Sequence, residues 1–503
     1  MNKRILVIGG GSAGVGAAYR AALCGAAVTL IEADDCLGGA STLGGVNCHE
    51  PGIASFGLNR VLYGHLKGME NAVGIGRTTH PYTRESNAGF NEIIPGIPYE
   101  ATLRRGDLGP LQVARVHFEP LAMAEAMRET LVSAGVKLLL NTRFRSALTD
   151  SDRVTGAVLE DAGGERFTLP CDALIDCTAD ANVFRSLGIK TYFGEDACSA
   201  FGEPSAPDVP KPIVNGVSLC FRVAPGDTGN EAPAWVYDTE AADWIRSTPL
   251  SAANVNAYPN CDLNYNPLPL MEGAEYHALP EEKRMSVLTA RLCLYWEKMK
   301  REHGHSGHIV SVFPRAGVRE SYRCDTLTML TENEMRRGCA SQGDDIIALA
   351  DHVLDTHGAR SKKLSLPSAL HDPYGIPMGS LIAKDYGNLL VAGRCAGFTH
   401  VAASSCRLTR TMMDIGEAAG AIAALSSDAR EANAAKVREA LNFGKYLDWV
   451  EKEYYKIGEY AHLCRRLPYS IKIYPKLIQN LPNTIDISAE FGKIYITTKI
   501  KER

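Results

Sequence analysis

Apolar and polar positions along the start of the chain follow the pattern of a strand–helix–strand unit. Residues 4–8 (RILVI) predict a short buried strand, and small residues then continue through a helical stretch that ends near Gly25. Residues 27–32 (AVTLIE) predict a second apolar strand. Because such units join parallel strands, the pattern indicates the α/β fold class.

The turn between the first strand and the helix carries glycines with the Gly-x-Gly-x-x-Gly spacing. Gly9 permits the tight turn, Gly11 lets the backbone approach a pyrophosphate, and Gly14 lets the helix lie close to the strand. Free backbone N–H groups at a helix start attract phosphates. Glu32, at the end of the second strand, is placed to accept ribose hydroxyls. We therefore expect a Rossmann-like dinucleotide site rather than a glycine-rich turn without a ligand.

A second glycine-rich stretch follows this unit, in residues 33–50 (ADDCLGGASTLGGVNCHE). Two Gly-Gly pairs within residues 38–45 bracket a Ser-Thr pair, so the stretch offers unhindered N–H groups and hydroxyls to more of a ligand. A simple NAD domain does not need such a cradle. An extended flavin cofactor does, and the cofactor predicted here is FAD.

Four segments carry a resemblance to a known family, and together they spread over roughly residues 1–425. They are the opening unit with its glycine cradle, residues 116–144, residues 317–334 and residues 373–425. These segments resemble the FAD-dependent oxidoreductase family of the glutathione-reductase-type FAD superfamily, which is related to fumarate reductase flavoproteins, thiazole synthases and the flavin subunit of heterodisulfide reductase. The resemblance implies a Rossmann-like FAD-binding domain with an inserted α+β substrate domain.

The candidate cofactor-binding residues lie in glycine turns, at strand ends or on the small face of the last helical segment. They are Gly9, Gly11, Ser12, Ala13, Gly14, Glu32, Ala33, Gly38, Gly39, Ser41, Thr42, Gly44, Gly45, Val46, Asn47, Phe144, Thr178, Ala179, Asp180, Gly393, Arg394 and Ala418. The resemblance implies that Phe144 lies near the adenine and that residues 178–180 lie beside the ADP. The start of the last helix, aimed at the flavin, would stabilise the anionic reduced ring.

Two residues near the last helix are candidates for the chemistry. His400 belongs to a Thr-His pair that the family commonly shows, which implies substrate binding or proton transfer. The alternative is a loop histidine that only orders the turn. Arg407 stands where the family usually carries arginine, and it could hold an anionic substrate or the flavin O2. The alternative for Arg407 is a surface ion pair.

Arg319 and Arg323 are the other candidates. If residues 317–334 are helical there, the two arginines share a face and could clamp a carboxylate. The alternative is a structural salt-bridge network. Tyr322 departs from the family, which often has a basic residue at this place.

Other polar clusters are expected to be less specific. We favour simple lining of the flavin pocket for Cys48 and His49 over a nucleophile pair or a covalent flavin link. His303, His305 and His308 could bind a metal, but they stand among glycines without a nearby carboxylate pattern, and a solvated loop is favoured. We expect no metal site.

The length of 503 residues predicts more than one domain. We expect the FAD-binding domain to combine residues 1–65, 115–185 and 370–430. Residues 66–114 and 186–369 should form the substrate domain, and residues 431–503 a C-terminal extension.

Composition and motifs exclude several classes of protein. The 14 cysteines form no Cys-x-x-Cys pair, and the chain shows no second Gly-x-Gly-x-x-Gly, which argues against a pyridine-nucleotide-disulfide reductase. Free thiols suggest the cytoplasm. A net charge of −5 argues against nucleic-acid binding, and no apolar run is long enough for a membrane span.

We therefore expect an enzyme that transfers a hydride between the flavin N5 and a small polar organic substrate. The arginines suggest a carboxylate, although a sugar-like substrate is also open. Two alternatives stand beside this expectation: a flavin subunit that relays electrons to a redox partner protein, and a flavoprotein that modifies tRNA. A homo-oligomer is equally compatible with the sequence.

Overall fold

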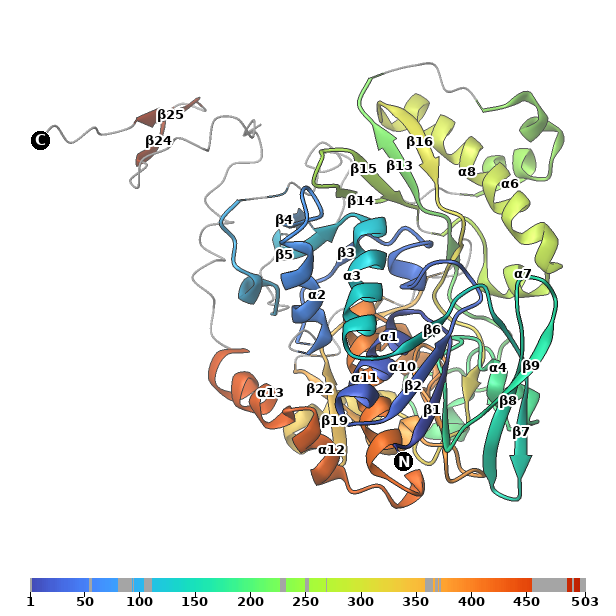
Figure 1. Ribbon diagram of the computed structural model, residues 1–503. Helices are drawn as coiled ribbons and strands as arrows, with labels where there is room; N and C mark the ends of the chain where they lie inside the picture. The colour runs from blue at the N-terminus through green and yellow to red at the C-terminus, as the bar shows by residue number, and fades with distance from the viewer. Residues whose placement is uncertain are drawn as a thin grey trace, which may run out of the picture.

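The protein is described from a computed structural model, in which a parallel sheet forms the centre (Figure 1). The structure describes residues 2–53, 57–79, 93, 95–103, 111–226, 232–248, 253–267, 269–357, 365, 366, 370, 372–454, 486–490 and 493–497. The sheet has the strand order β23-β10-β1-β2-β6, and all its neighbours pair in parallel. Its strands are β1 (Arg4–Ile8), β2 (Ala27–Ile31), β6 (Lys137–Leu139), β10 (Ala173–Asp176) and β23 (Leu389–Val391). The predicted α/β class is confirmed.

Helices α1 (Ser12–Leu23) and α11 (Thr409–Leu425), from opposite ends of the chain, pack against each other. Their small residues allow this approach. A Cβ added to Gly416 would lie 2.1 Å from the carbonyl oxygen of Ala13, and one added to Gly420 would lie 2.2 Å from that of Ala17. The small face predicted for the last helical segment therefore receives the backbone of α1.

A three-stranded antiparallel meander lies between β6 and β10 in the chain. It consists of β7 (Arg143–Asp150), β8 (Arg153–Glu160) and β9 (Arg166–Pro170). Helix α3 (Pro120–Ser133) precedes it. The meander lies beside the parallel sheet and away from the second sheet of the molecule (Figure 1).

A second, antiparallel sheet has the strand order β14-β15-β13-β16 and its own hydrophobic core. Its strands are β13 (Phe221–Ala224), β14 (Asn254–Ala257), β15 (Leu263–Asn266) and β16 (His308–Val312), and the helices α6 (Ala241–Ser247) and α8 (Glu281–His303) accompany it. Phe221 and Tyr265 stack on this sheet, and Trp296 of α8 packs edge-on against both. This unit is the inserted α+β part, at the upper right of Figure 1.

The core of the parallel sheet extends further along the chain than the expected domain boundaries. It includes Cys324 and β19 (Ile346–Ala350), which pairs with β22 (Tyr374–Pro377) of the expected FAD-binding domain. It also includes Val437 and Phe443, from α12 (Ala434–Ala440) and α13 (Phe443–Trp449). The start of the expected C-terminal extension thus packs as part of the first domain.

A small sheet beside the glycine cradle has the order β3-β5-β4. Its strands are β3 (Cys48–His49), β4 (Val73–Thr79) and β5 (Leu111–Phe118). Beyond residue 454 the structure describes the antiparallel pair β24 (Asp486–Glu490) and β25 (Lys493–Thr497). Across the described ranges, every helix is too short or too polar to cross a bilayer.

Candidate active site

A cavity of about 1440 Å³ lies at the carboxyl ends of the parallel strands. Its lining includes residues from the ends of β1 and β2, and residues that follow β10 and β23. Open α/β sheets bind their ligands at this edge. Pockets for one drug-sized ligand measure about 300–1,000 Å³, so this cavity has room for a large cofactor and a substrate.

The first glycine turn has the geometry that the sequence predicts. Gly9 has a φ of 103°, and a Cβ there would lie 2.4 Å from the carbonyl oxygen of Cys177. A Cβ on Gly14 would lie 1.8 Å from the carbonyl oxygen of Gly9. Around Gly11, in contrast, a Cβ would meet no described atom within 4 Å. The turn therefore holds α1 against the sheet and leaves open space at Gly11.

The open space at Gly11 meets the start of α1. Gly11 caps this helix without a side-chain hydrogen bond, so the first backbone N–H groups are available to an anion. Glu32 lies beside the same turn, where its carboxylate accepts hydrogen bonds from the N–H groups of Gly10 at 2.5 Å and Asp34 at 3.0 Å. Burial raises the pKa of Glu32. A pyrophosphate at α1 and a ribose at Glu32 fit these donors and acceptors.

Most of the predicted cofactor-binding residues line the cavity. They are Gly9, Gly11, Ser12, Ala13, Glu32, Ala33, Gly39, Gly44, Val46, Phe144, Thr178, Ala179, Asp180, Gly393 and Arg394. The others do not belong to its lining, because they lie behind it inside helices α1 and α11 or within the glycine cradle: Gly14, Gly38, Ser41, Thr42, Gly45, Asn47 and Ala418. Cys48 and His49 also line the cavity, as expected for pocket-wall residues.

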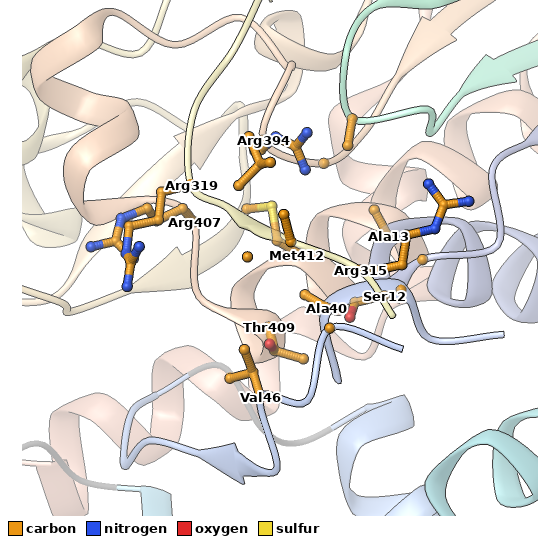
Figure 2. A pocket seen from close by; sticks show the side chains of 18 of the residues that line it. Ser12, Ala13, Ala40, Val46, Arg315, Arg319, Arg394, Arg407, Thr409 and Met412 are labelled. Carbon is orange, nitrogen blue, oxygen red and sulfur yellow. The ribbon is translucent and has the colours of Figure 1, made fainter. Parts of the chain in front are cut away.

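The last helix presents its first turn to the cavity. Thr409 and Met412 of α11 line it, and no side chain caps the N-terminus of this helix at Leu408. Arg394 stands near this turn and donates to Asp180 at 2.6 Å (Figure 2). A partial positive charge at the start of α11 suits an anionic flavin ring.

Two of the predicted catalytic residues, Arg319 and Arg407, also line the cavity. Figure 2 shows them side by side, with Ser12 and Ala13 on the opposite side and Met412 between the two groups. Arg319 is held by hydrogen bonds from its Nη1 to the carbonyl oxygen of Gly216 at 2.9 Å and to Ser218 Oγ at 2.8 Å. We call the side of the cavity around Arg319 and Arg407 the arginine end.

The arginine end includes a histidine–carboxylate pair that the sequence analysis missed. His357 Nε2 lies 2.5 Å from Asp355 Oδ2, and the same oxygen lies 3.4 Å from Arg407 Nη2. Burial, opposed by the hydrogen bond to Asp355, lowers the pKa of His357 to about 4. The spacing Asp-x-His at the end of β20 (Leu354–Asp355) is too common to single out by sequence alone.

His400 and Arg323 are not brought to this cavity. His400 Nδ1 lies 2.9 Å from Glu320 Oε1, and Arg323 Nη1 lies 2.8 Å from Asp196 Oδ2. The Nη2 of Arg323 also donates to the carbonyl oxygen of Gly194 at 2.6 Å. Both side chains are buried, so they form the structural network that was the alternative for Arg323. Helix α10 (His400–Ser405) starts at this network.

Further polar residues line the cavity without having been predicted. Arg410 donates to the carbonyl oxygen and the hydroxyl of Thr102 at 2.8 and 3.0 Å, and burial lowers its pKa. Arg115 contacts Glu50 at 3.2 Å. Four asparagines also line the cavity: Asn254, Asn256, Asn264 and Asn266. Their alternation in residues 254–266 was a visible signal, because side chains two apart in a strand share a face.

The three histidines of residues 303–308 lie outside this cavity. His305 Nδ1 lies 2.9 Å from the Tyr265 hydroxyl, and His308 Nδ1 lies 3.1 Å from the carbonyl oxygen of Gly226. No cluster of three or more His, Cys, Asp or Glu side chains that could hold a metal occurs among the residues that the structure describes.

Solved structures resemble this fold at low identity. A geranylgeranyl bacteriochlorophyll reductase-like protein from Thermoplasma acidophilum is 12% identical, with a TM-score of 0.44, over 90% of this chain and 87% of that chain. The myxobacterial chondrochloren halogenase CndH is 10% identical, with a TM-score of 0.44, over 93% and 86%. The flavin-dependent brominase Bmp2 is 11% identical, with a TM-score of 0.44, over 90% and 84%.

No curated protein matches the chain in sequence. A family model described as FAD dependent oxidoreductase, however, matches residues 4–441. The match spans the parallel sheet, the inserted sheet and every residue of the cavity described above. The chain therefore belongs to the FAD dependent oxidoreductase family and is an enzyme that uses FAD.

Proposed function

We propose that this enzyme transfers a hydride between FAD and a small organic substrate that carries a carboxylate. Bound FAD would supply the hydride acceptor or donor. The observation that carries the proposal is the placement of Arg319 and Arg407 together in the cavity that also contains the glycine turn before α1 (Figure 2).

The charges at the arginine end call for an anion. Burial and then the charge of Arg407 lower the pKa of Arg319 to about 10. Arg407 contacts the carboxylate of Asp355, but the same carboxylate also accepts a hydrogen bond from His357. Enclosed cations are stabilised by paired anions, and arginine forms two parallel hydrogen bonds with a carboxylate. A substrate carboxylate would meet both requirements.

His357 is placed to move the proton that accompanies hydride transfer. Its lowered pKa keeps the ring neutral near pH 7. Because Nε2–H donates to Asp355, the free lone pair of the ring is on Nδ1. Nδ1 can accept the proton of a substrate hydroxyl while the carbon that bears this hydroxyl loses its hydrogen to the flavin as hydride. Asp355 would hold the ring and stabilise the imidazolium that forms. In the opposite direction His357 would return the proton.

The polar chamber supports a substrate enzyme over a flavin subunit that only relays electrons. A relay requires a short path from the flavin to the partner protein, and it has no use for two half-buried arginines side by side. The net charge of −5 supports the same choice over a tRNA-modifying enzyme.

Flavin bleaching without oxygen tests the proposal. The purified enzyme with FAD is mixed with a panel of 2-hydroxy acids and with the corresponding amides. We expect the acids to bleach the flavin and the amides to act at least about 100-fold less efficiently, since they lack the charge that two arginines bind. Equal bleaching by acids and amides would contradict the carboxylate site.

A further inference from the structure

Four asparagine side chains of the inserted sheet face the cavity as one patch. Strands β14 and β15 pair with Asn254 opposite Asn266 and Asn256 opposite Asn264. Side chains two apart along a strand point to the same face, so the four amides share one face of the pair. All four line the cavity. We call Asn254, Asn256, Asn264 and Asn266 the amide patch.

The opposite face of the same strands explains why this patch is not part of the core. Val255 and Tyr265 alternate with the asparagines and are buried in the hydrophobic core of the inserted sheet, against Trp296. One face therefore stabilises the domain, and the other face presents only neutral amides to the cavity.

The amide patch contains unsatisfied acceptors. Among the described residues, the side-chain oxygens of Asn264 and Asn266 are buried and have no hydrogen-bond partner. Asn264 is fully buried. Buried acceptors without a donor are rare in folded proteins and point to a group that binds there.

Hydrogen bonds join the amide patch to the glycine cradle on one side and, through Arg115, toward the arginine end on the other. Asn264 Nδ2 donates to the carbonyl oxygen of Gly45 at 2.6 Å and to Asn47 Oδ1 at 2.8 Å. Arg115 Nη1 lies 3.3 Å from the side-chain oxygens of both Asn254 and Asn256.

From there the contacts continue through Glu50. Its Oε1 lies 3.2 Å from Arg115 Nη2, and its Oε2 lies 3.5 Å from His352 Nε2. The charge of His352 is in turn one of the influences that lower the pKa of Asp355, the partner of His357. The amide patch and the arginine end are thus two walls of one chamber.

Four neutral amides side by side are suited to bind the hydroxyl groups of a substrate. An amide offers both donors and acceptors, and each hydroxyl is also both a donor and an acceptor. The cation beside the patch, Arg115, is already paired with Glu50, so the patch itself does not call for a second anion. We propose that the substrate is a polyhydroxylated carboxylate, a sugar acid, whose carboxylate binds Arg319 and Arg407 and whose hydroxyls bind the amide patch. The carboxylate half rests on the proposed function, whereas the hydroxyl half rests on the amide patch alone.

Binding to the enzyme with oxidised FAD, measured by calorimetry without oxygen, tests this inference independently of turnover. D-gluconate and D-glucuronate are compared with hexanoate, which has a carboxylate on a six-carbon chain without hydroxyls. We expect at least one sugar acid to bind at least about tenfold more tightly than hexanoate, the factor for about one well-placed hydrogen bond.

Two variants localise the effect. Asn266→Leu, which removes an unsatisfied acceptor at similar volume, should weaken the sugar acid about tenfold and leave hexanoate unchanged. Asn260→Ala is the matched control, since this asparagine is exposed in the turn between the same two strands. It should change neither ligand. The flavin spectrum and the melting temperature report whether each variant is folded.

Each contrary result points to a different failure. If hexanoate binds as tightly as the sugar acids, or if no ligand of the panel binds, the sugar-acid inference is overturned. If sorbitol binds as tightly as gluconate and Arg319→Gln has no effect on either, the carboxylate of the proposed function is wrong, and the sugar-acid inference is overturned with it, although the patch would still be a hydroxyl site.

Discussion

The backbone of α11 lies directly against Gly16 of α1: a Cβ on Gly16 would stand 2.2 Å from the carbonyl oxygen of Met413. This contact joins residues from the two ends of the chain, and both helices present their first turns to the cofactor cavity. Close packing of the two helices is thus a condition for the cavity.

The variant Gly16→Ala should force α1 and α11 apart. Overpacking of a core costs about 1–3 kcal/mol or more, and backbone on both sides leaves little freedom to relax. We expect a lower melting temperature and loss of bound FAD. The control is Gly64→Ala in α2 (Leu58–Leu66), where a Cβ would meet nothing within 4 Å. There alanine should stabilise the helix by up to about 1 kcal/mol. Equal melting temperatures for the two variants would contradict the contact.

The variant Gly11→Val separates folding from cofactor binding. A side chain at Gly11 would enter open space in the protein, but this space is where we place the pyrophosphate. The apoprotein should therefore melt within a few degrees of the unmodified apoprotein, while flavin absorbance of the purified enzyme should be lost. Normal retention of FAD would show that the phosphates do not lie at this turn.

The variant His357→Gln tests the proposed proton transfer. Glutamine keeps a hydrogen bond to Asp355 but cannot accept a proton, so the rate of flavin bleaching at saturating substrate should fall about 10²–10⁴-fold with little change in substrate affinity. His308→Gln, in β16 and outside the cavity, is the control. If both variants bleach at the original rate, His357 is not the proton carrier.

Stability should depend on pH through His400 and Glu320. Burial opposes the charge on His400, but the Glu320 carboxylate outweighs it and raises the pKa of His400. A raised pKa stabilises the folded state fully below the unfolded pKa of about 6.5, and this contribution is lost as the pH rises through the folded pKa.

The pKa of Glu320 shifts in the opposite direction. Burial acts to raise it, but the charge of His400 leads the interactions that lower it. Its contribution is lost as the pH falls through that lowered pKa. The free energy of unfolding, measured by denaturant titration at a series of pH values, should therefore decrease above about pH 6.5. The variant His400→Gln should flatten this decrease. An unchanged slope in His400→Gln would rule out the pair as its source.

The sequence by itself determined the opening unit and the cofactor. Gly14 lies against Gly9, and Glu32 accepts a hydrogen bond from the N–H of Gly10, so both contacts fall within one short stretch and local spacing was enough to predict this turn. The last helix followed from periodicity in the same way. These predictions succeeded because each depends on residues that are close together in the chain.

Only the tertiary structure decided which polar side chains meet in the cavity. Arg319 and Arg323 are four residues apart, yet one lines the cavity and the other is paired with Asp196 in a buried network. His400 pairs with Glu320 and does not line the cavity. Asp355 and His357 became part of the site because the chain returns there beside Arg407. Which of the two arginines pairs with an internal carboxylate depends on contacts across the whole fold, and no local pattern contains that information.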